Sequence, residues 1–173
     1  AITRSSRDWD AGQREWTLWR FGRDTAHRVA AVGGGVVKTR GDGVLFTTDQ
    51  PASAVRIALD TVDAHEADPD LPSVRGGVAM GPVLLRLGDV YGQPVNIASR
   101  LSDEARPGSV LVDRECSEQL GPEFEQRLLA RPSVRGYRSW VPRRVRRAQA
   151  RQGAEALQRE GPPRARARTG PGG

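Results

Sequence analysis

Cysteine, aromatic residues and long apolar runs are all scarce in this 173-residue sequence. Its single cysteine, Cys116, excludes an internal disulfide framework and predicts a reducing compartment, which we interpret as the cytoplasm. No apolar run approaches the ~20 residues that a membrane-spanning helix needs. The polar opening Ala-Ile-Thr-Arg-Ser-Ser-Arg is unlike a signal peptide, and the absence of an initiator Met favours a processed product or a fragment. Because aromatic residues make up only 5%, we expect a core of Val, Leu, Ala and Ile.

The net charge of +6 is unevenly distributed along the chain. Residues 143–173 are mainly Arg, Ala, Gln, Pro and Gly, so they cannot bury enough apolar surface to fold, and we predict a disordered basic tail. Spaced arginines with few aromatic residues attract phosphate without reading a base sequence, so we expect no specific nucleic-acid partner. Residues 1–12 are predicted to be a flexible lead-in.

Between these ends, residues 13–142 alternate between helical and strand-like patterns. Apolar spacing and a following glycine run predict a helix over 14–32, and Pro51 opens a second helix over 52–64. Further patterns predict strands over 35–40, 44–48, 74–81, 82–88 and 109–113, a short helix over 114–120, and weaker strands over 124–129 and from 134. This order predicts an α+β domain of the ferredoxin-like, split βαβ type, with one mixed or antiparallel sheet and helices packed on one face.

The most informative stretch is residues 88–100, Gly-Asp-Val-Tyr-Gly-Gln-Pro-Val-Asn-Ile-Ala-Ser-Arg. It begins as a turn, and Pro94 suits the first turn of a helix. Asn96 and Arg100 are four residues apart, so they lie on one helical face. An amide and a guanidinium there can hold a sugar oxygen and a phosphate together. A solvated polar face of an ordinary amphipathic helix remains an alternative interpretation.

A second candidate lies in Gly41-Asp42-Gly43, between two strand-like runs. Asp-Gly at that place predicts a tight hairpin turn. Asp42 therefore either serves only to form the turn or presents its carboxylate at the hairpin tip, where a hard cation such as Mg²⁺ can bind it. Lys38 lies on the incoming strand, on the same face by period two, and by itself suits a solvated strand position.

Four runs in this order resemble the catalytic domain of class III nucleotidyl cyclases, especially bacterial adenylate cyclases. They are Val-Val-Lys-Thr-Arg-Gly-Asp-Gly (36–43), Arg-Gly-Gly-Val-Ala-Met-Gly (75–81), Gly-Asp-Val-Tyr-Gly-Gln-Pro-Val-Asn-Ile-Ala-Ser-Arg-Leu (88–101) and Ala-Arg-Pro-Gly-Ser-Val-Leu-Val (105–112). The resemblance covers about residues 15 to 140 and implies conversion of ATP to 3′,5′-cyclic AMP and pyrophosphate in intracellular signalling. It also implies a site shared across a homodimer or heterodimer, with two Mg²⁺ or Mn²⁺ ions in its complete form.

The resemblance also implies roles for individual residues. Asp42 matches one of two metal-binding aspartates. Lys38 and Asp89 match the pair that reads the purine, and Lys with Asp is the adenine type: Lys donates to ring N1 and Asp accepts from the 6-amino group. Guanine would leave both groups mispaired. Asn96 matches the residue that orients the ribose, and Arg100 the residue that stabilises charge on the phosphate.

Two further positions complete this comparison. Arg135 lies near the place where the family often carries a basic residue for the terminal phosphates. The first metal aspartate, in a Phe-x-Asp-x-x-Gly-Phe-Thr-like strand, has no counterpart: Asp8 and Asp10 lie in Arg-Asp-Trp-Asp-Ala-Gly. We therefore expect an N-terminally truncated domain without its opening central strand and with uncertain activity of its own. The alternative is a non-catalytic cyclase-homology domain that serves as a dimerisation or nucleotide-binding regulatory partner.

Overall fold

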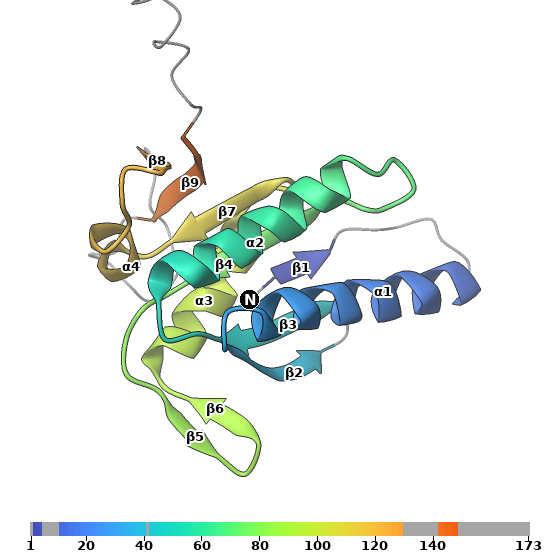
Figure 1. Cartoon of the computed structure of the whole chain (residues 1–173), viewed down its shortest axis with the longest axis horizontal. Helices are drawn as coiled ribbons and strands as arrows, with labels where there is room; N and C mark the ends of the chain where they lie inside the picture. Colours follow the sequence, from blue (N-terminus) through green and yellow to red (C-terminus); the bar gives the residue numbers. More distant parts are fainter. Residues whose placement is uncertain (1, 5–10, 41, 130–141, 149–173) are drawn as a thin grey trace, which may run out of the picture.

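The computed structural model describes residues 2–4, 11–40, 42–129 and 142–148 (Figure 1). Glycine and proline mark the boundaries of its first two helices. Gly33, with a φ of 72°, ends the first helix, and Pro51 occupies the first turn of the second. In chain order the elements are β1 (Ile2–Arg4), α1 (Ala11–Ala30), β2 (Gly35–Arg40), β3 (Gly43–Thr47), α2 (Pro51–Glu66), β4 (Val74–Val78), β5 (Leu84–Arg86), β6 (Asp89–Tyr91), α3 (Gln93–Glu104), β7 (Ser109–Val112), α4 (Arg114–Glu118), β8 (Phe124–Leu128) and β9 (Arg143–Arg147).

The described strands form a seven-stranded mixed sheet and a separate hairpin. The order in the sheet is β2-β3-β1-β4-β7-β9-β8, with β4 and β7 parallel and the other neighbours antiparallel. The pair β5–β6 forms the hairpin, which projects away from the sheet in Figure 1. The predicted α+β class is confirmed, and the predicted strand pair 35–40 and 44–48 is present as the β2–β3 hairpin.

The helices cover both faces of the sheet, which corrects the expectation of one face. Val74 and Val78 of β4 pack in a core cluster with α2 and with Phe21 of α1. Gly77 points the other way, because successive strand residues alternate between faces, and α3 packs there. Leu111 of β7 lies in the second cluster, with Ile97, Leu101 and Ala105. The helix that carries Asn96 and Arg100 is thus on the face opposite α1 and α2.

A short strand, β1, lies inside the sheet between β3 and β4, within residues that we expected to be a flexible lead-in. β1 pairs with β3 through Ile2↔Val44 and with β4 through Ile2↔Gly76. Three residues are enough because both neighbouring edges present backbone donors and acceptors to them. The sequence of β1, Ile-Thr-Arg, contains no acidic residue. The central place is therefore filled without the metal-binding aspartate of the family pattern.

The predicted basic tail is wrong for its first residues, because Arg143–Arg147 form β9 between β7 and β8. Val145 is 2% exposed and belongs to the core. Arg146 pairs with both carboxylate oxygens of Glu125, at 2.8 and 2.7 Å, and Arg147 contacts Asp60. Backbone hydrogen bonds to β7 and β8 and the ion pairs hold this strand in place. The prediction of a disordered tail considered only apolar content, so it took neither into account. Residues 149–173 and the strand predicted from 134 lie outside the described residues.

No helix within the described residues is long and apolar enough to cross a lipid bilayer.

Candidate functional site

The fold brings together Lys38 and Asp89, which are 51 positions apart in the sequence. Lys38 lies on β2 and Asp89 is the first residue of β6. The Lys38 Nζ atom donates to both carboxylate oxygens of Asp89, each at 2.7 Å. The backbone N–H of Val90 also donates to Asp89 Oδ1, at 2.8 Å. The two side chains are 40% and 31% exposed, so the pair contributes at most about 1 kcal/mol to stability. Its importance is the fixed orientation of one donor and one acceptor at the protein surface.

Helix α3 follows the hairpin directly and places Asn96 and Arg100 at the surface. β6 ends at Tyr91 and α3 begins at Gln93, with Pro94 in its first turn. Asn96 and Arg100 are both exposed, whereas Ile97 and Leu101 are buried against the sheet. The predicted helix is thereby confirmed. Asp89, Asn96 and Arg100 all belong to one continuous unit, β6–α3, so a movement of that unit moves them together.

Close packing of α3 on β4 fixes the position of this unit. A Cβ atom added at Gly77 would lie 2.3 Å from the Ala98 backbone oxygen, 2.5 Å from Leu101 Cβ and 2.5 Å from the Ser102 nitrogen. Only glycine permits the helix to approach the strand so closely. Gly77 therefore determines how far the exposed residues of α3 stand from the sheet.

Asp42 is exposed in the turn between β2 and β3, where the hairpin signal predicts it. Among the described residues, no group of three or more His, Cys, Asp or Glu side chains is placed to hold a metal ion. A hard divalent cation needs several oxygen ligands, and a lone exposed carboxylate does not supply them. The described residues therefore do not fit a complete metal centre. Arg135 lies outside the described residues.

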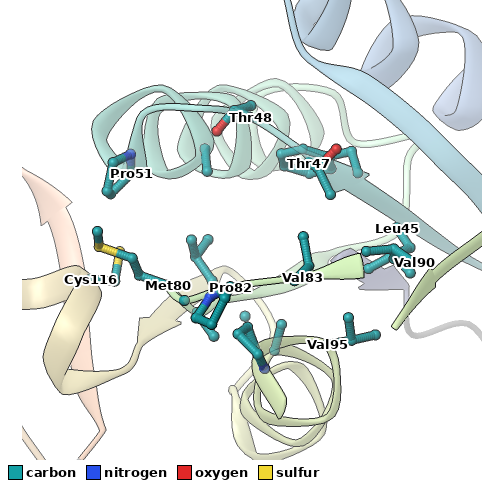
Figure 2. A pocket seen from close by; sticks show the side chains of 18 of the residues that line it. Leu45, Thr47, Thr48, Pro51, Met80, Pro82, Val83, Val90, Val95 and Cys116 are labelled. Carbon is teal, nitrogen blue, oxygen red and sulfur yellow. The ribbon is translucent and has the colours of Figure 1, made fainter. Parts of the chain in front are cut away.

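A cavity of about 410 Å³ lies beside the Lys38–Asp89 pair, and sequence reasoning missed it. Leu45, which is opposite Lys38 in the β2–β3 register, lines it, and so does Val90, which follows Asp89. Figure 2 shows the cavity between Thr47, Thr48 and Pro51 on one side and Met80, Pro82 and Val83 on the other. Cys116 also faces it, and burial raises the pKa of this thiol to about 12, so the thiol is protonated and unreactive near neutral pH.

A buried carboxylate near the cavity was also missed. Asp113 is 0% exposed and caps α4, accepting from the Cys116 N–H at 2.8 Å. It also accepts from the Met80 N–H, at 3.3 and 3.1 Å to its two oxygens, and so ties the exit of β4 to the exit of β7. Burial raises the pKa of Asp113 to about 6 and outweighs these hydrogen bonds. The available sequence signal was an Asp directly before a short helix.

Replacing Asp113 with asparagine should change how stability depends on pH. The pKa of Asp113 in the folded protein is about 6, above its usual value of 3.8. Between these two pH values the folded protein therefore keeps a proton on Asp113 that the unfolded chain has lost. Its contribution to the free energy of unfolding is thus fully present below about pH 4 and is lost as pH rises through 6. Relative to the wild type, Asp113→Asn should gain up to about 3 kcal/mol between pH 4 and 7. Urea unfolding of both proteins across this range measures the difference, and parallel curves would contradict the assignment.

Comparisons with known proteins agree with this architecture. The adenylate cyclase of Streptomyces coelicolor is 45% identical over 100 residues, which are 58% of this chain and 26% of that protein. The adenylate cyclase of Glutamicibacter nicotianae is 38% identical over 120 residues, 68% of this chain and 30% of that protein. The catalytic core of a rhodopsin-guanylyl cyclase with converted specificity, solved with ATPαS, has a TM-score of 0.72 at 22% identity, over 80% of this chain and 86% of that one. No family model matches the chain.

The chain therefore has the fold of nucleotidyl cyclase domains and is similar in sequence to proteins of the class III nucleotidyl cyclase family. The sequence matches are to bacterial adenylate cyclases, the relatives that the four sequence runs predict. The chain spans about a quarter of the length of the Streptomyces coelicolor relative, 26%.

Proposed function

We propose that this domain takes part in converting ATP to 3′,5′-cyclic AMP and pyrophosphate, at a site completed by a second cyclase domain. The observation that carries the proposal is the Lys38–Asp89 pair, held at 2.7 Å beside an apolar cavity and directly before α3. A lysine donor next to a carboxylate acceptor matches the N1 acceptor and 6-amino donor of adenine. The neighbouring apolar side chains Leu45 and Val90 suit the faces of a purine ring.

The reaction we propose is an in-line displacement at the α-phosphorus. The ribose 3′-oxygen forms a bond to phosphorus, the bond to the bridging oxygen breaks, pyrophosphate leaves, and the 3′-hydroxyl proton passes to solvent. Asn96 holds the ribose by hydrogen bonds, and Arg100 donates to phosphate oxygens whose charge grows in the transition state. We further propose that Asp42 is a ligand of one of two Mg²⁺ or Mn²⁺ ions.

A homodimer or heterodimer is part of the proposal, because the described residues of one chain supply only part of the site. The β5–β6 hairpin and its flanks expose a group of apolar side chains, with Leu84 at 61%, Leu85 at 66% and Leu87 at 95%. Contiguous exposed apolar residues on a protruding hairpin are typical of a protein–protein interface. We propose that this surface contacts the second domain.

The second candidate function is a regulatory partner that binds nucleotide without turning it over alone. The lone Asp42, with no acidic cluster in the described part of the chain, favours it. Mixing the protein with a cyclase that retains its metal aspartates but lacks its arginine separates the candidates. Cyclic AMP formation by the protein alone supports the complete enzyme, and formation only in the mixture supports the partner. No cyclic AMP in either sample would contradict both.

Exchanging the purine-reading pair should change the preferred nucleotide. Guanine presents an acceptor at position 6 and donors at N1 and N2, the reverse of the adenine edge. Lys38→Glu combined with Asp89→Cys should therefore raise the GTP-to-ATP ratio of kcat/KM by at least tenfold, since an unpaired polar group costs about 1–3 kcal/mol. Initial rates with both nucleotides measure this ratio in whichever sample forms cyclic AMP, the protein alone or its mixture with the arginine-deficient cyclase. An unchanged ratio would remove Lys38 and Asp89 from base recognition.

A further inference from the structure

Strand β2 contains one residue more than the strand that pairs with it. Its six residues, Gly35–Arg40, lie opposite the five residues of β3, Gly43–Thr47. The paired positions are Gly35↔Thr47, Val36↔Phe46, Lys38↔Leu45, Thr39↔Val44 and Arg40↔Gly43. Val37 is left without a partner in β3, and an extra residue of this kind forms a β-bulge. The bulge lies directly before Lys38.

Both ends of β2 are held in place, so the extra residue must lie between them. At one end, the turn keeps Arg40 opposite Gly43. At the other end, Gly34 packs so tightly that an added Cβ atom would lie 2.7 Å from the backbone oxygen of Thr47. Neither end can therefore slide by one residue without losing its contacts. The bulge takes up the difference in length between the two strands.

Two residues of β2 face helix α1 although they are three positions apart. Val36 lies opposite Phe46, and Thr39 lies opposite Val44. Phe46 and Val44 both pack in the core cluster that includes Phe21 of α1, and directly opposed residues share a face of the sheet. In a regular strand, residues three apart point to opposite faces. The bulge between Val36 and Thr39 thus shifts the alternation by one residue.

This shift places Lys38 on the face away from α1. Its partner is Leu45, the neighbour of Val44 in β3, and successive strand residues point to opposite faces. On this face the Lys38 ammonium reaches the carboxylate of Asp89 at 2.7 Å. If β2 were paired regularly from Gly35, Lys38 would lie opposite Val44 and would face α1 instead.

We propose that the bulge at Val37 is the positioning element of the Lys38–Asp89 pair. It supplies one residue of chain length, which carries Lys38 from the α1 face to the face on which Asp89 lies. Bulges often occur beside active sites, where they redirect a side chain. The role of Val37 in reading the purine rests on the proposed function, whereas its effect on the contact between the two side chains does not involve a nucleotide.

Two single-residue deletions test this proposal, because each shortens β2 to five residues and removes the bulge. Deletion of Val37 leaves Lys38 opposite Leu45, on its present face. Deletion of Thr39 places Lys38 opposite Val44, on the α1 face, at a position where Thr39 itself is exposed. The two variants have the same length and the same turn, so they differ chiefly in the face that carries the lysine.

The contact itself is measured by carbodiimide crosslinking of the full chain, which joins an amine to a carboxylate in contact with it, with loss of water. Lys38 is the only lysine in the sequence, so mass spectrometry identifies its amide with Asp89 without competing lysines. We expect the yield of the Val37 deletion to stay within twofold of the wild type and that of the Thr39 deletion to fall at least tenfold. Asp89→Asn defines the background.

Equal yields in the two deletions would overturn the proposal, since the face of Lys38 would then not depend on the bulge. A loss of the crosslink in the Val37 deletion would also overturn it. Urea unfolding shows that each variant is folded before the yields are compared.

The same variants separate this proposal from the proposed function. In whichever sample forms cyclic AMP, deletion of Thr39 should lower the ATP-to-GTP ratio of kcat/KM at least tenfold, and deletion of Val37 should change it less than threefold. If crosslinking changes as expected and the ratio does not, base recognition by Lys38 is wrong and its positioning by the bulge stands. The crosslink decides the positioning even where neither sample forms cyclic AMP.

An exchange of two side chains provides the same test if the Thr39 deletion does not fold. Val36→Lys combined with Lys38→Val keeps the chain length and the single lysine. Val36 is 39% exposed, so a lysine is tolerated there. In a regular strand position 36 would share the face of position 38, but across the bulge it faces α1. The crosslink to Asp89 should therefore fall at least tenfold, and a retained crosslink would contradict the proposal.

Discussion

Replacing Arg100 with alanine should lower cyclic AMP formation about 10²- to 10³-fold, with little change in the KM for ATP. The reason is that Arg100 is exposed on α3, where its guanidinium can meet phosphate oxygens as their charge increases. An interaction of this kind is stronger in the transition state than in the bound substrate, so its loss appears in kcat. Initial rates in the active mixture, with ATP varied, separate the two kinetic constants.

A matched control distinguishes this role from a general loss of positive charge. Arg114 is also exposed on a helix, α4, but pairs with Glu118 of the same helix. Arg114→Ala should keep turnover within twofold of the wild type. The same urea midpoint for all three proteins would exclude unfolding as the cause. Wild-type turnover in Arg100→Ala would remove the catalytic assignment.

Replacing Gly77 with alanine should reduce both stability and turnover, although Gly77 touches no substrate in our proposal. The new Cβ would overlap backbone atoms of α3 at 2.3 and 2.5 Å, and backbone cannot move aside as a side-chain tip can. Overpacking of this kind costs about 1–3 kcal/mol or more. The helix must move off β4, and Asn96 and Arg100 move with it. Urea unfolding and initial rates on the same samples measure both effects.

Gly22→Ala is the control for a glycine substitution that the structure tolerates. Gly22 lies within α1, and an added Cβ meets only Thr39 Cγ2, at 3.8 Å, an ordinary contact. Alanine is a better helix former than glycine, so this variant should be neutral or more stable by up to about 1 kcal/mol. If Gly77→Ala behaves like Gly22→Ala, close packing at Gly77 does not position α3.

Local patterns were sufficient where the structure depends on neighbouring residues. Asp-Gly between two strand-like runs predicted the β2–β3 hairpin, and Pro94 with apolar spacing predicted α3. The predicted helix over 52–64 agrees with Pro51–Glu66. These elements depend on turn geometry, on the fixed φ of proline and on the periodicity of a helix, all of which act within a few residues.

Patterns failed where distant segments decide the outcome. β1 has three residues and β9 is rich in arginine, so neither has a strong strand signal of its own. Both are strands because neighbouring edges pair with them, and β9 is also held by Glu125 and Asp60. Asp113 gave only the weak sequence signal of a helix cap, since its burial and its bond to Met80 arise from the meeting of β4 and β7.

The sequence by itself predicted the resemblance to nucleotidyl cyclases, the hairpin that carries Asp42 and the helical face that carries Asn96 and Arg100. Only the tertiary structure decided that Lys38 meets Asp89, that α3 lies on the face opposite α1 and α2, and that a cavity opens between residues 45–49 and residues 77–83. The physical reason is the range of the interactions. Turns, caps and helical periodicity are set by adjacent residues, whereas pairing across 51 positions and the space between strands exist only after the chain has packed.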